Sequence, residues 1–574
     1  MTLLEPQGTP ASEPSAHVDT FVRDNLPPVA DWPPLDFSGV PDLRYPARIN
    51  CAVELLDRMA QAGHADRPAI HFEGRVLIYR ELLENANRIA HVLVEELGVV
   101  PGNRVLLRGP NNPTMVASWF AVLKMGGVVV TTMPLLRARE LSYILEKARV
   151  SVALCDSRLL EDMRVAMERA AGPGGAHRVR VAYFGPEAPA AGGEAVRHTL
   201  EALAADKPSA FENVATAADD PALIAFTSGT TGQAKGTVHF HRDVLAVCDT
   251  FSRYILRPTA EDIFTGTPPL AFTYGLGGLL LFPLRVGASS ALVEKTTPDG
   301  LLQALQDYGA TTLFTSPTMY RTLVDLVSKH DVSSLKKCVS AGEPLPLPTY
   351  EAWLRATGIK IIDGIGSTEM LHIFISAAGD DIRPGSTGKV VPGYQACVVD
   401  DSVNPVPPGT VGKLAVRGPT GCRYLADPER QRAYVQNGWN LTGDAYKMDE
   451  DGYFWFQARA DDMIISAGYN IAGPEVENVL LEHPKVKECA VVAAPDPIRG
   501  NIVKAFIVLR EPADATATTV EELQRFVKSE IAPYKYPRAI EFVDSLPRTE
   551  TGKLQRYKLR QMEQERAQSA RAGG

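Results

Sequence analysis

The chain has 574 residues, too many for one compact core, so two or more domains are expected. Its composition, 45% hydrophobic and 22% charged residues, is ordinary for a soluble globular protein. The formal net charge of −9 argues against a nucleic-acid binder, because that role needs a basic surface that displaces counterions from phosphates.

The cysteines and the lack of long apolar segments indicate the cellular setting. The seven cysteines form no CxxC pair, which is typical of reduced thiols in a cytosolic protein. The N-terminus has no basic start followed by an apolar stretch, so no signal peptide is predicted. No segment reaches the roughly 18 apolar residues of a membrane span. We therefore expect a cytoplasmic protein without a membrane partner.

Residues 1–45 are rich in proline and polar side chains and are expected to form an extended N-terminal arm. After the arm, helical and strand-like patterns alternate. Helices are predicted over residues 79–98, 115–125 and 140–148, and strands over 103–109, 126–132 and 150–156. Strands separated by helices predict an α/β region with parallel or mixed sheets, a large domain of several subdomains that we place at residues 46–460.

The pattern changes near Ala467. A helix over residues 472–483, two strands within 484–510 and a helix over 520–531 predict a small α+β domain, which we place at residues 461–574. The polar tail, residues 560–574, is expected to fray.

A loop rich in glycine and threonine, "TSGTTGQAKG" at residues 227–236, follows the strand-like stretch 222–226. Glycines permit positive φ, so successive backbone N–H groups can turn toward one anion. Hydroxyl groups and one ammonium group add donors, those of Thr227, Ser228, Thr230, Thr231 and Lys235. The loop is not a Walker motif, since Ala234 precedes the lysine and Gly236 follows it. By itself it is either a phosphate cradle or a polar turn between strands.

Other motifs along the chain decide between these alternatives. They follow the loop in this order: "SAGEPLP" from Ser340, "DGIGSTEM" from Asp363, "LTGDAY" from Leu441, "ARADDMI" from Ala458, "SAGYNIAGPEVE" from Ser466 and "PRTETGKLQR" from Pro547. Together with the loop, they resemble the ordered signatures of the adenylate-forming superfamily, which includes acyl-CoA synthetases and peptide-synthetase adenylation domains. The resemblance covers residues 50–560, nearly the whole chain.

The resemblance implies a two-step reaction that uses ATP, Mg²⁺ and coenzyme A. A carboxylate and ATP give an acyl-adenylate and pyrophosphate, and a thiol then captures the acyl group. The ATP phosphates would bind the loop residues Thr227, Ser228, Gly229, Thr230, Thr231, Gly232 and Lys235. Glu369 would ligate Mg²⁺, which prefers oxygen donors, and Thr368 would reach the α-phosphate.

The rest of the nucleotide has an implied site as well. Its contacts would be Ala341, Gly342, Glu343, Pro344, Asp363, Gly364 and Ile365. Many relatives carry an aromatic residue at Ile365, so aliphatic packing would replace ring stacking on adenine. Asp444 can accept hydrogen bonds from both ribose hydroxyls, and Arg459 would hold ribose or phosphate. Taken singly, Glu369 and Asp444 could be helix caps and Arg459 a surface ion pair. The ordered set favours the functional roles.

Lys553 is the implied catalytic residue of the small domain. In relatives the corresponding lysine reaches the carboxylate and the α-phosphate, so Lys553→Ala is expected to slow adenylation by about 10²–10³ and to spare thioester formation. Gly468 and Tyr469 of the same domain would line a tunnel for the pantetheine arm of CoA. Lys553 and the tunnel residues Gly468 and Tyr469 cannot face one active site at the same time. The resemblance therefore implies a mobile small domain that rotates about a hinge at Asp461.

Two stretches, "PPLAFTYGLGG" and "GIGSTEMLHIF", most resemble benzoate– and 2-aminobenzoate–CoA ligases. They imply two walls of an acyl pocket: Phe272, Thr273, Tyr274 and Gly275 on one side, and Gly366, His372 and Ile373 on the other. Aromatic and aliphatic side chains at a glycine-lined slot suit a flat ring, although the same side chains also suit a core. We expect His372 to orient the carboxylate or to meet an ortho substituent, or else to bond to backbone as a wall residue.

Several alternatives stay open at this point. The acid is 2-aminobenzoate, which the motif details favour, or benzoate. The acceptor is CoA or the phosphopantetheine thiol of a carrier protein. A non-catalytic nucleotide-binding protein is a further alternative, against which the retained Lys235, Glu369, Asp444, Arg459 and Lys553 count. The protein is expected to be a monomer or a homodimer.

Overall fold

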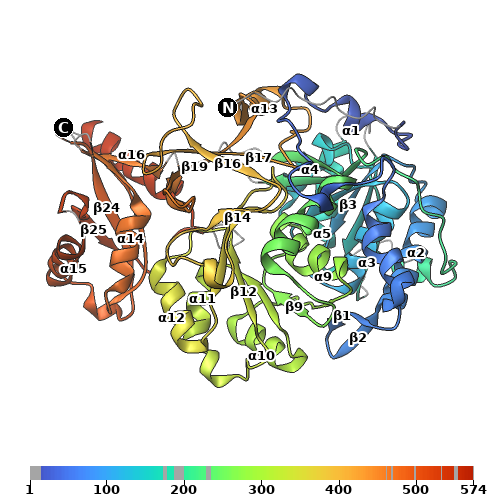
Figure 1. The fold of residues 1–574 in the computed structure, drawn as a ribbon, viewed down its shortest axis with the longest axis horizontal. Coiled ribbons are helices and arrows are strands. Elements are labelled where there is room, and N and C mark those ends of the chain that lie inside the picture. Colours follow the sequence, from blue (N-terminus) through green and yellow to red (C-terminus); the bar gives the residue numbers. More distant parts are fainter. Residues whose placement is uncertain are drawn as a thin grey trace.

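The computed structural model describes residues 14–171, 178–186, 199–227, 234–459, 462–466, 469–496, 499–531, 533–548 and 554–572. Figure 1 shows a large region built on three sheets and a smaller C-terminal unit, in orange and red, at one side of it. This α/β architecture with a separate small unit confirms the predicted fold class.

A six-stranded sheet carries the glycine–threonine loop. Its strand order is β6-β5-β3-β4-β7-β8, and all neighbours are parallel except β7 and β8. The strands are β3 (Arg104–Arg108), β4 (Val128–Thr132), β5 (Val152–Asp156), β6 (Arg180–Phe184), β7 (Pro221–Thr227) and β8 (Lys235–Phe240). The accompanying helices are α2 (Tyr79–His91), α3 (Pro113–Lys124), α4 (Ala138–Lys147), α5 (Leu160–Ala171) and α6 (Leu200–Ala204). Strands β3, β4 and β5 are buried along their whole length, as parallel strands covered on both faces are. The predicted alternation of helix and strand is confirmed.

A nine-stranded sheet lies beside it, with the order β15-β14-β13-β12-β11-β9-β10-β1-β2. Its strands are β1 (Pro68–Phe72), β2 (Arg75–Ile78), β9 (Ile263–Gly266), β10 (Ser289–Ala291), β11 (Thr312–Thr315), β12 (Lys337–Ala341), β13 (Ile361–Gly366), β14 (Ile373–Ser376) and β15 (Lys389–Val390). Inner neighbours are parallel, and β2, β14 and β15 add antiparallel pairs. Its helices are α7 (His241–Val247), α8 (Thr273–Leu276), α9 (Phe282–Arg285), α10 (Pro298–Tyr308), α11 (Pro317–Val324) and α12 (Leu347–Thr357). One apolar cluster, from Ile49 to Phe454 in the sequence, packs residues of both large sheets together.

An antiparallel five-stranded sheet completes the large region. It contains β16 (Gln395–Val399), β17 (Val411–Arg417), β18 (Val435–Gln436), β19 (Trp439–Met448) and β20 (Phe454–Arg459), with helix α13 (Pro428–Tyr434) before β18. No helix in the described ranges is both long enough and apolar enough to cross a membrane.

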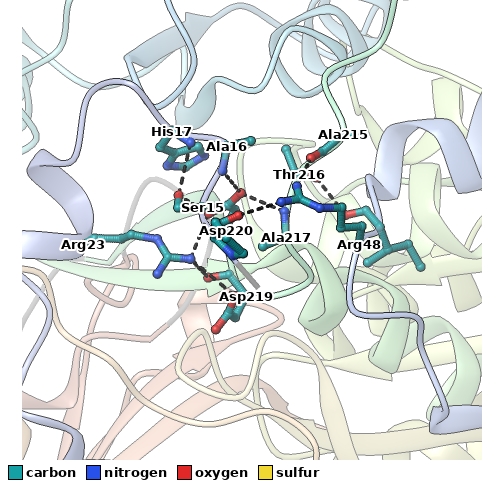
Figure 2. A network of polar contacts seen from close by, with 12 residues as sticks. Ser15, Ala16, His17, Arg23, Arg48, Ala215, Thr216, Ala217, Asp219 and Asp220 are labelled. Carbon is teal, nitrogen blue, oxygen red and sulfur yellow. Dashed lines mark hydrogen bonds and ion pairs between the residues drawn. The ribbon is translucent and has the colours of Figure 1, made fainter. Parts of the chain in front are cut away.

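The described part of the N-terminal arm, residues 14–45, lies against the six-stranded sheet (Figure 1). It contains the short helix α1 (Phe21–Asp24) and two helical turns, η1 (Val29–Asp31) and η2 (Pro41–Leu43). Figure 2 shows its anchor, Asp220, whose carboxylate accepts from the Ser15 hydroxyl at 2.5 Å and from Arg23 Nη2 at 2.8 Å. Asp220 is fully buried, so two arm residues satisfy a carboxylate that water does not reach.

The small unit has its own sheet and core. Strands β23 (Val486–Asp496), β24 (Gly500–Leu509) and β25 (Ala539–Phe542) form the sheet, and β21 (Ile464–Ser466) pairs with β22 (Tyr469–Ile471) as a separate hairpin. Helices α14 (Gly473–Glu482) and α15 (Ala517–Glu530) pack on it, and apolar side chains such as Val476 and Leu523 form its core. The predicted pair of helices around two strands is confirmed.

The expected fraying of the tail is wrong for most of its length. Helix α16 runs from Arg556 to Ala572. Its Leu559 is buried, Met562 packs beside it, and Glu563 accepts from Lys504 Nζ at 2.8 Å. Apolar positions three residues apart give this polar helix one buried stripe, which holds it on the sheet.

Candidate active site

The two ends of the glycine–threonine loop are held side by side. Thr227 ends β7 and Lys235 begins β8, and the two residues are paired in the antiparallel ladder. Ser228, Gly229, Thr230, Thr231 and Gly232 lie outside the described residues, so their contacts stay predictions. The described ends place the loop at the carboxyl end of β7, an edge where ligands of open α/β sheets commonly bind.

Glu369 and Lys235 meet around Tyr424. The Tyr424 hydroxyl donates to Glu369 Oε1 at 2.6 Å, and Lys235 Nζ lies 5.5 Å from the centroid of the Tyr424 ring. Burial and the Glu369 carboxylate raise the pKa of Tyr424, so the hydroxyl remains a donor. The carbonyl oxygen of Thr368 accepts from His239 Nε2 of β8 at 2.8 Å. The loop after β13 is thus bound to the strand that carries Lys235.

The two motifs implied to hold adenine lie on neighbouring strands. Ala341 ends β12 and is paired with Gly364 of β13, and Ser340 is paired with Asp363. Gly342 follows with φ +91°, a conformation that favours glycine. The other two residues of that turn are Glu343 and Pro344, and Ile365 lies next to Gly364 on β13.

The carboxylate of Asp363 is only partly satisfied by hydrogen bonds in this structure. Its Oδ1 is buried and has no hydrogen-bond partner, and burial raises the pKa of Asp363 to about 7. A buried acceptor without a donor is costly in the free protein. A ligand that brings an N–H group to Asp363 would remove this cost.

The ribose pair is also brought together. Asp444 of β19 is buried and lies opposite Arg459 of β20 in the antiparallel ladder. The Asp444 N–H donates to Thr442 Oγ1 at 3.2 Å. The backbone register thus places the two residues opposite each other on neighbouring strands.

The residues of the small domain are placed only in part. Lys553, Gly468 and Asp461 lie outside the described residues. Tyr469 begins β22, where it is paired with Ser466 of β21. Arg548 and Leu554 form an antiparallel bridge, so the two ends of the segment that contains Lys553 are held together.

Arg548 also links the two domains, a contact that the motifs did not indicate. Its Nη2 donates to Glu488 Oε2 of the small domain at 2.7 Å. Its Nη1 lies 3.3 Å from Thr318 Oγ1 and 3.8 Å from Glu343 Oε1 of the large domain. Glu343 belongs to the turn implied to hold adenine, so Arg548, in the motif that contains Lys553, lies next to that turn.

The two stretches implied to form the acyl pocket meet at His372. Its ring centroid lies 5.8 Å from that of Tyr274 and 4.5 Å from that of Phe282, both in the helical segment after β9. The Tyr274 hydroxyl donates to the carbonyl oxygens of Thr315 and Val339, which fixes its ring. Neither nitrogen of His372 has a hydrogen-bond partner among the described residues, and burial lowers the pKa of His372 to about 3. The imidazole is therefore neutral, and the backbone of Tyr274 lies close enough to oppose part of this lowering of the pKa.

Glycines allow the two walls to approach each other. A Cβ added to Gly277 would lie 2.3 Å from the His372 ring, and one added to Gly366 would lie 2.6 Å from the His372 carbonyl oxygen. Ile373 begins β14 and packs on Gly364 of β13. Phe272, Thr273 and Gly275 lie at the start of the same helical segment as Tyr274, at its junction with the turn after β9.

Sequence reasoning missed Tyr424, His239, Phe282, Gly277 and Arg548 as members of the site. Gly277 and Phe282 lie in or just after a quoted stretch, and the run of glycines within a helix is a signal for close packing. Tyr424 carries no such signal, because its contact with Glu369 spans 55 positions of the chain.

Residues 57–424 match the AMP-binding enzyme family, and residues 475–553 match the C-terminal domain of AMP-binding enzymes. The chain is 35% identical to a benzoate–CoA ligase of Thauera aromatica, over 91% of this chain and 97% of that protein. An uncharacterised acyl–CoA ligase of Bacillus subtilis is 36% identical, over 85% of this chain and 90% of that protein.

Solved structures give the same result. The anthranilate–CoA ligase AuaEII in complex with anthranoyl-AMP superposes with a TM-score of 0.85 at 34% identity, over 91% of this chain and 99% of that one. A benzoate–CoA ligase from Burkholderia xenovorans LB400 gives a TM-score of 0.79 at 33% identity, over 89% of this chain and all of that one. This chain belongs to the AMP-binding enzyme family, within its acyl- and aryl-CoA ligases, and is an acid–thiol ligase that forms AMP.

Proposed function

We propose that the protein is an aryl-CoA ligase that activates an aromatic carboxylate of the 2-aminobenzoate or benzoate type. The observation that carries the proposal is the neutral His372 imidazole, which contacts the rings of Tyr274 and Phe282. Gly277 and Gly366 lack the Cβ atoms that would collide with His372. Aromatic faces of this kind suit contact with a flat ring, because aromatic pairs favour edge or offset contacts. Relatives named for benzoate and anthranilate support the same class of acid.

In the first step a carboxylate oxygen attacks the α-phosphorus of ATP, and the bond from that phosphorus to the β-phosphate oxygen breaks to release pyrophosphate. Two anions must approach each other, so preorganised donors and positive charge lower the barrier. We assign the leaving phosphates to residues 227–235, including Lys235, and the carboxylate and α-phosphate to Lys553 and Thr368. Lys553 donates to the oxygens on which negative charge shifts.

Glu369 fits the proposed Mg²⁺ site, since its carboxylate is a hard oxygen donor that Tyr424 holds in place. Among the described residues, no three His, Cys, Asp or Glu side chains gather as a protein-only metal cage. That agrees with a cation held by one carboxylate and by substrate phosphates, where it would neutralise phosphate charge. The residues themselves bind and orient: Asp363 Oδ1 would accept from the adenine amino group, and Asp444 from the ribose hydroxyls.

In the second step a thiolate attacks the acyl carbon, the bond from that carbon to the phosphate oxygen breaks, and AMP leaves. We assign the thiol path to Gly468 and Tyr469, and we place the boundary between the two domains at the proposed hinge, Asp461. CoA is the proposed acceptor, and the thiol of a carrier protein is the alternative. We further propose that the enzyme acts in the cytoplasm as a monomer or homodimer.

Turnover with a panel of acids tests the proposal. With ATP, Mg²⁺ and CoA, 2-aminobenzoate and benzoate should give AMP and thioester with a higher kcat/KM than phenylacetate or octanoate. Preference for octanoate would refute the aryl assignment. Replacing CoA by a phosphopantetheinylated carrier protein, at equal thiol concentration, separates the two acceptors. Failure to form AMP with any of these acids would instead favour a non-catalytic nucleotide-binding role.

A further inference from the structure

A polar hollow of about 360 Å³ opens at the edge of the six-stranded sheet where β3, β5 and β6 begin. Four arginines line it, together with Asn103 and Ser151: Arg104, Arg149, Arg178 and Arg180. The hollow has the size of a small-molecule site, for which volumes start at about 300 Å³. Its lining, however, is mainly polar and cationic.

Arg104 forms the fixed floor of the hollow. Its Nε donates to the Ala148 carbonyl at 2.9 Å and its Nη2 to the Arg149 carbonyl at 2.6 Å. Its Nη1 donates to Asp19 Oδ2 at 2.5 Å and to the Gly102 carbonyl at 3.0 Å. Each nitrogen of this guanidinium is thus engaged by the protein, and Asp19 neutralises one positive charge.

The other arginines keep unused donors. Arg180 Nη1 donates to the Leu97 carbonyl at 2.6 Å, and the guanidinium of Arg149 lies 4.9 Å from the Phe21 ring centroid. Within the described residues, neither of these side chains nor Arg178 forms an ion pair with a carboxylate. Gly98 leaves room for Arg180, because an added Cβ would lie 2.7 Å from its Nη1.

The charge of the hollow is positive, whereas the net charge of the whole protein is negative. Arg149, Arg178 and Arg180, which form no ion pair with any described residue, gather positive charge on a protein whose formal net charge is −9. Like charges held together are unfavourable unless a counter-ion binds among them. Guanidinium groups present forks of N–H donors that match phosphate oxygens two at a time. We infer that this hollow is a binding site for an oligophosphate anion, bound by Arg149 and Arg180 with Arg178 at the rim.

The hollow is separate from the candidate active site. In a parallel sheet all amino ends lie at one edge and all carboxyl ends at the other. The arginines lie where β3, β5 and β6 begin, whereas Thr227 lies where β7 ends. A strand of five residues spans about 16 Å. The inference therefore does not rest on the proposed function, although that reaction releases pyrophosphate.

Hydrogen-exchange mass spectrometry with tripolyphosphate tests the site by location. Binding at the hollow should slow hydrogen exchange in peptides that cover residues 97–104 and 149–152. Binding at the candidate active site would instead slow exchange in peptides that cover residues 221–240, so the two sites are distinguished. The Arg149→Ala/Arg180→Ala variant should lose that protection and bind at the hollow at least about tenfold more weakly. Arg139→Ala is the matched control, because Arg139 is an exposed residue of α4 outside the hollow. It should bind as the wild type does.

Ser151→Asp gives a second variant that keeps every arginine and places a negative charge in the hollow. It should also lose the protection, which keeps the test decisive if the double variant fails to fold. Pyrophosphate and ADP distinguish the source of the anion: tighter binding of ADP assigns the site to nucleotides, and tighter binding of pyrophosphate assigns it to inorganic phosphates. No protection at residues 97–104 and 149–152 in the wild type, or equal protection in all variants, would overturn the inference.

Discussion

At the scale of single residues, the Tyr424 hydroxyl holds Glu369, the proposed magnesium ligand, at 2.6 Å. Tyr424→Phe removes this hydrogen bond to a charged group. We expect the Mg²⁺ concentration for half-maximal adenylation to rise and pyrophosphate exchange to slow by about tenfold. Tyr434→Phe is the control, because the Tyr434 hydroxyl lies 3.4 Å from Ser367 Oγ, within the same buried cluster. Equal effects of the two variants on the Mg²⁺ dependence would contradict the role given to Tyr424.

Asp363 predicts a dependence of stability on pH. Burial raises the pKa of Asp363 to about 7, above its value in the unfolded chain. The folded protein then holds a proton that the unfolded chain releases, so stability is lost as pH rises from about 4 to 7. Asp363→Asn should remove this loss of stability at high pH, because an amide does not titrate. Without ATP, the variant should melt about 2–4 °C higher than the wild type at pH 8 and at the same temperature at pH 4. A difference that does not change with pH would show that this carboxyl does not titrate as described.

At the scale of elements, the helical segment that begins with α8 is shaped around His372. Gly277 has φ −61°, a helical value that alanine adopts readily, but an added Cβ would lie 2.3 Å from the His372 ring. Gly277→Ala should therefore raise the KM for the aromatic acid by roughly tenfold and leave the KM for ATP unchanged. His372→Ala in the same chain removes the collision, so the two substitutions should not be additive. Additive effects of the two substitutions on KM would show that Gly277→Ala does not act through a collision with His372.

At the same scale, the bridge between Arg548 and Leu554 holds together the two ends of the segment that contains Lys553. Arg548 fastens it to Thr318 and Glu343 of the large domain and to Glu488 of the small one. Arg548→Ala should slow adenylation by about tenfold, because the lysine segment loses its attachment beside the adenine turn. Thioester formation from supplied acyl-adenylate should change little. Arg548→Lys should restore part of the rate. Equal slowing of both steps would show a general loss of structure.

How far the sequence predicts these elements depends on the range of the interactions. The helices and strands between residues 79 and 156 were predictable because each carries its own apolar periodicity. The contact of Tyr424 with Glu369, in contrast, joins segments that lie 55 positions apart in the chain. Helix α16 was missed because its buried stripe of Leu559 and Met562 is narrow within a polar sequence.

At the scale of the whole molecule, motif order indicated the reaction class, whereas motif residues could not show how the domains touch. The N-terminal arm illustrates the limit. Its prolines predict an extended segment, but the buried Asp220 that anchors it lies 205 positions from Ser15. No local pattern encodes such a pairing.

The proposal that Lys553 of the small domain acts in adenylation but not in thioester formation is a prediction about the whole molecule. Lys553→Ala should slow acyl-adenylate formation by about 10²–10³, because a donor to developing charge is removed. The same variant should convert supplied aryl-adenylate and CoA to thioester at nearly the wild-type rate. Rapid-quench measurement of each half-reaction separates the two. Loss of both would refute the division.

Exchange of radiolabelled pyrophosphate into ATP tests the central claim most directly, since it needs only the first step and no thiol. With Mg²⁺ and either 2-aminobenzoate or benzoate, label should enter ATP, and omission of the acid should abolish the exchange. Label that never enters ATP with any aromatic acid, or that enters equally without acid, would contradict activation of an aromatic carboxylate by this protein.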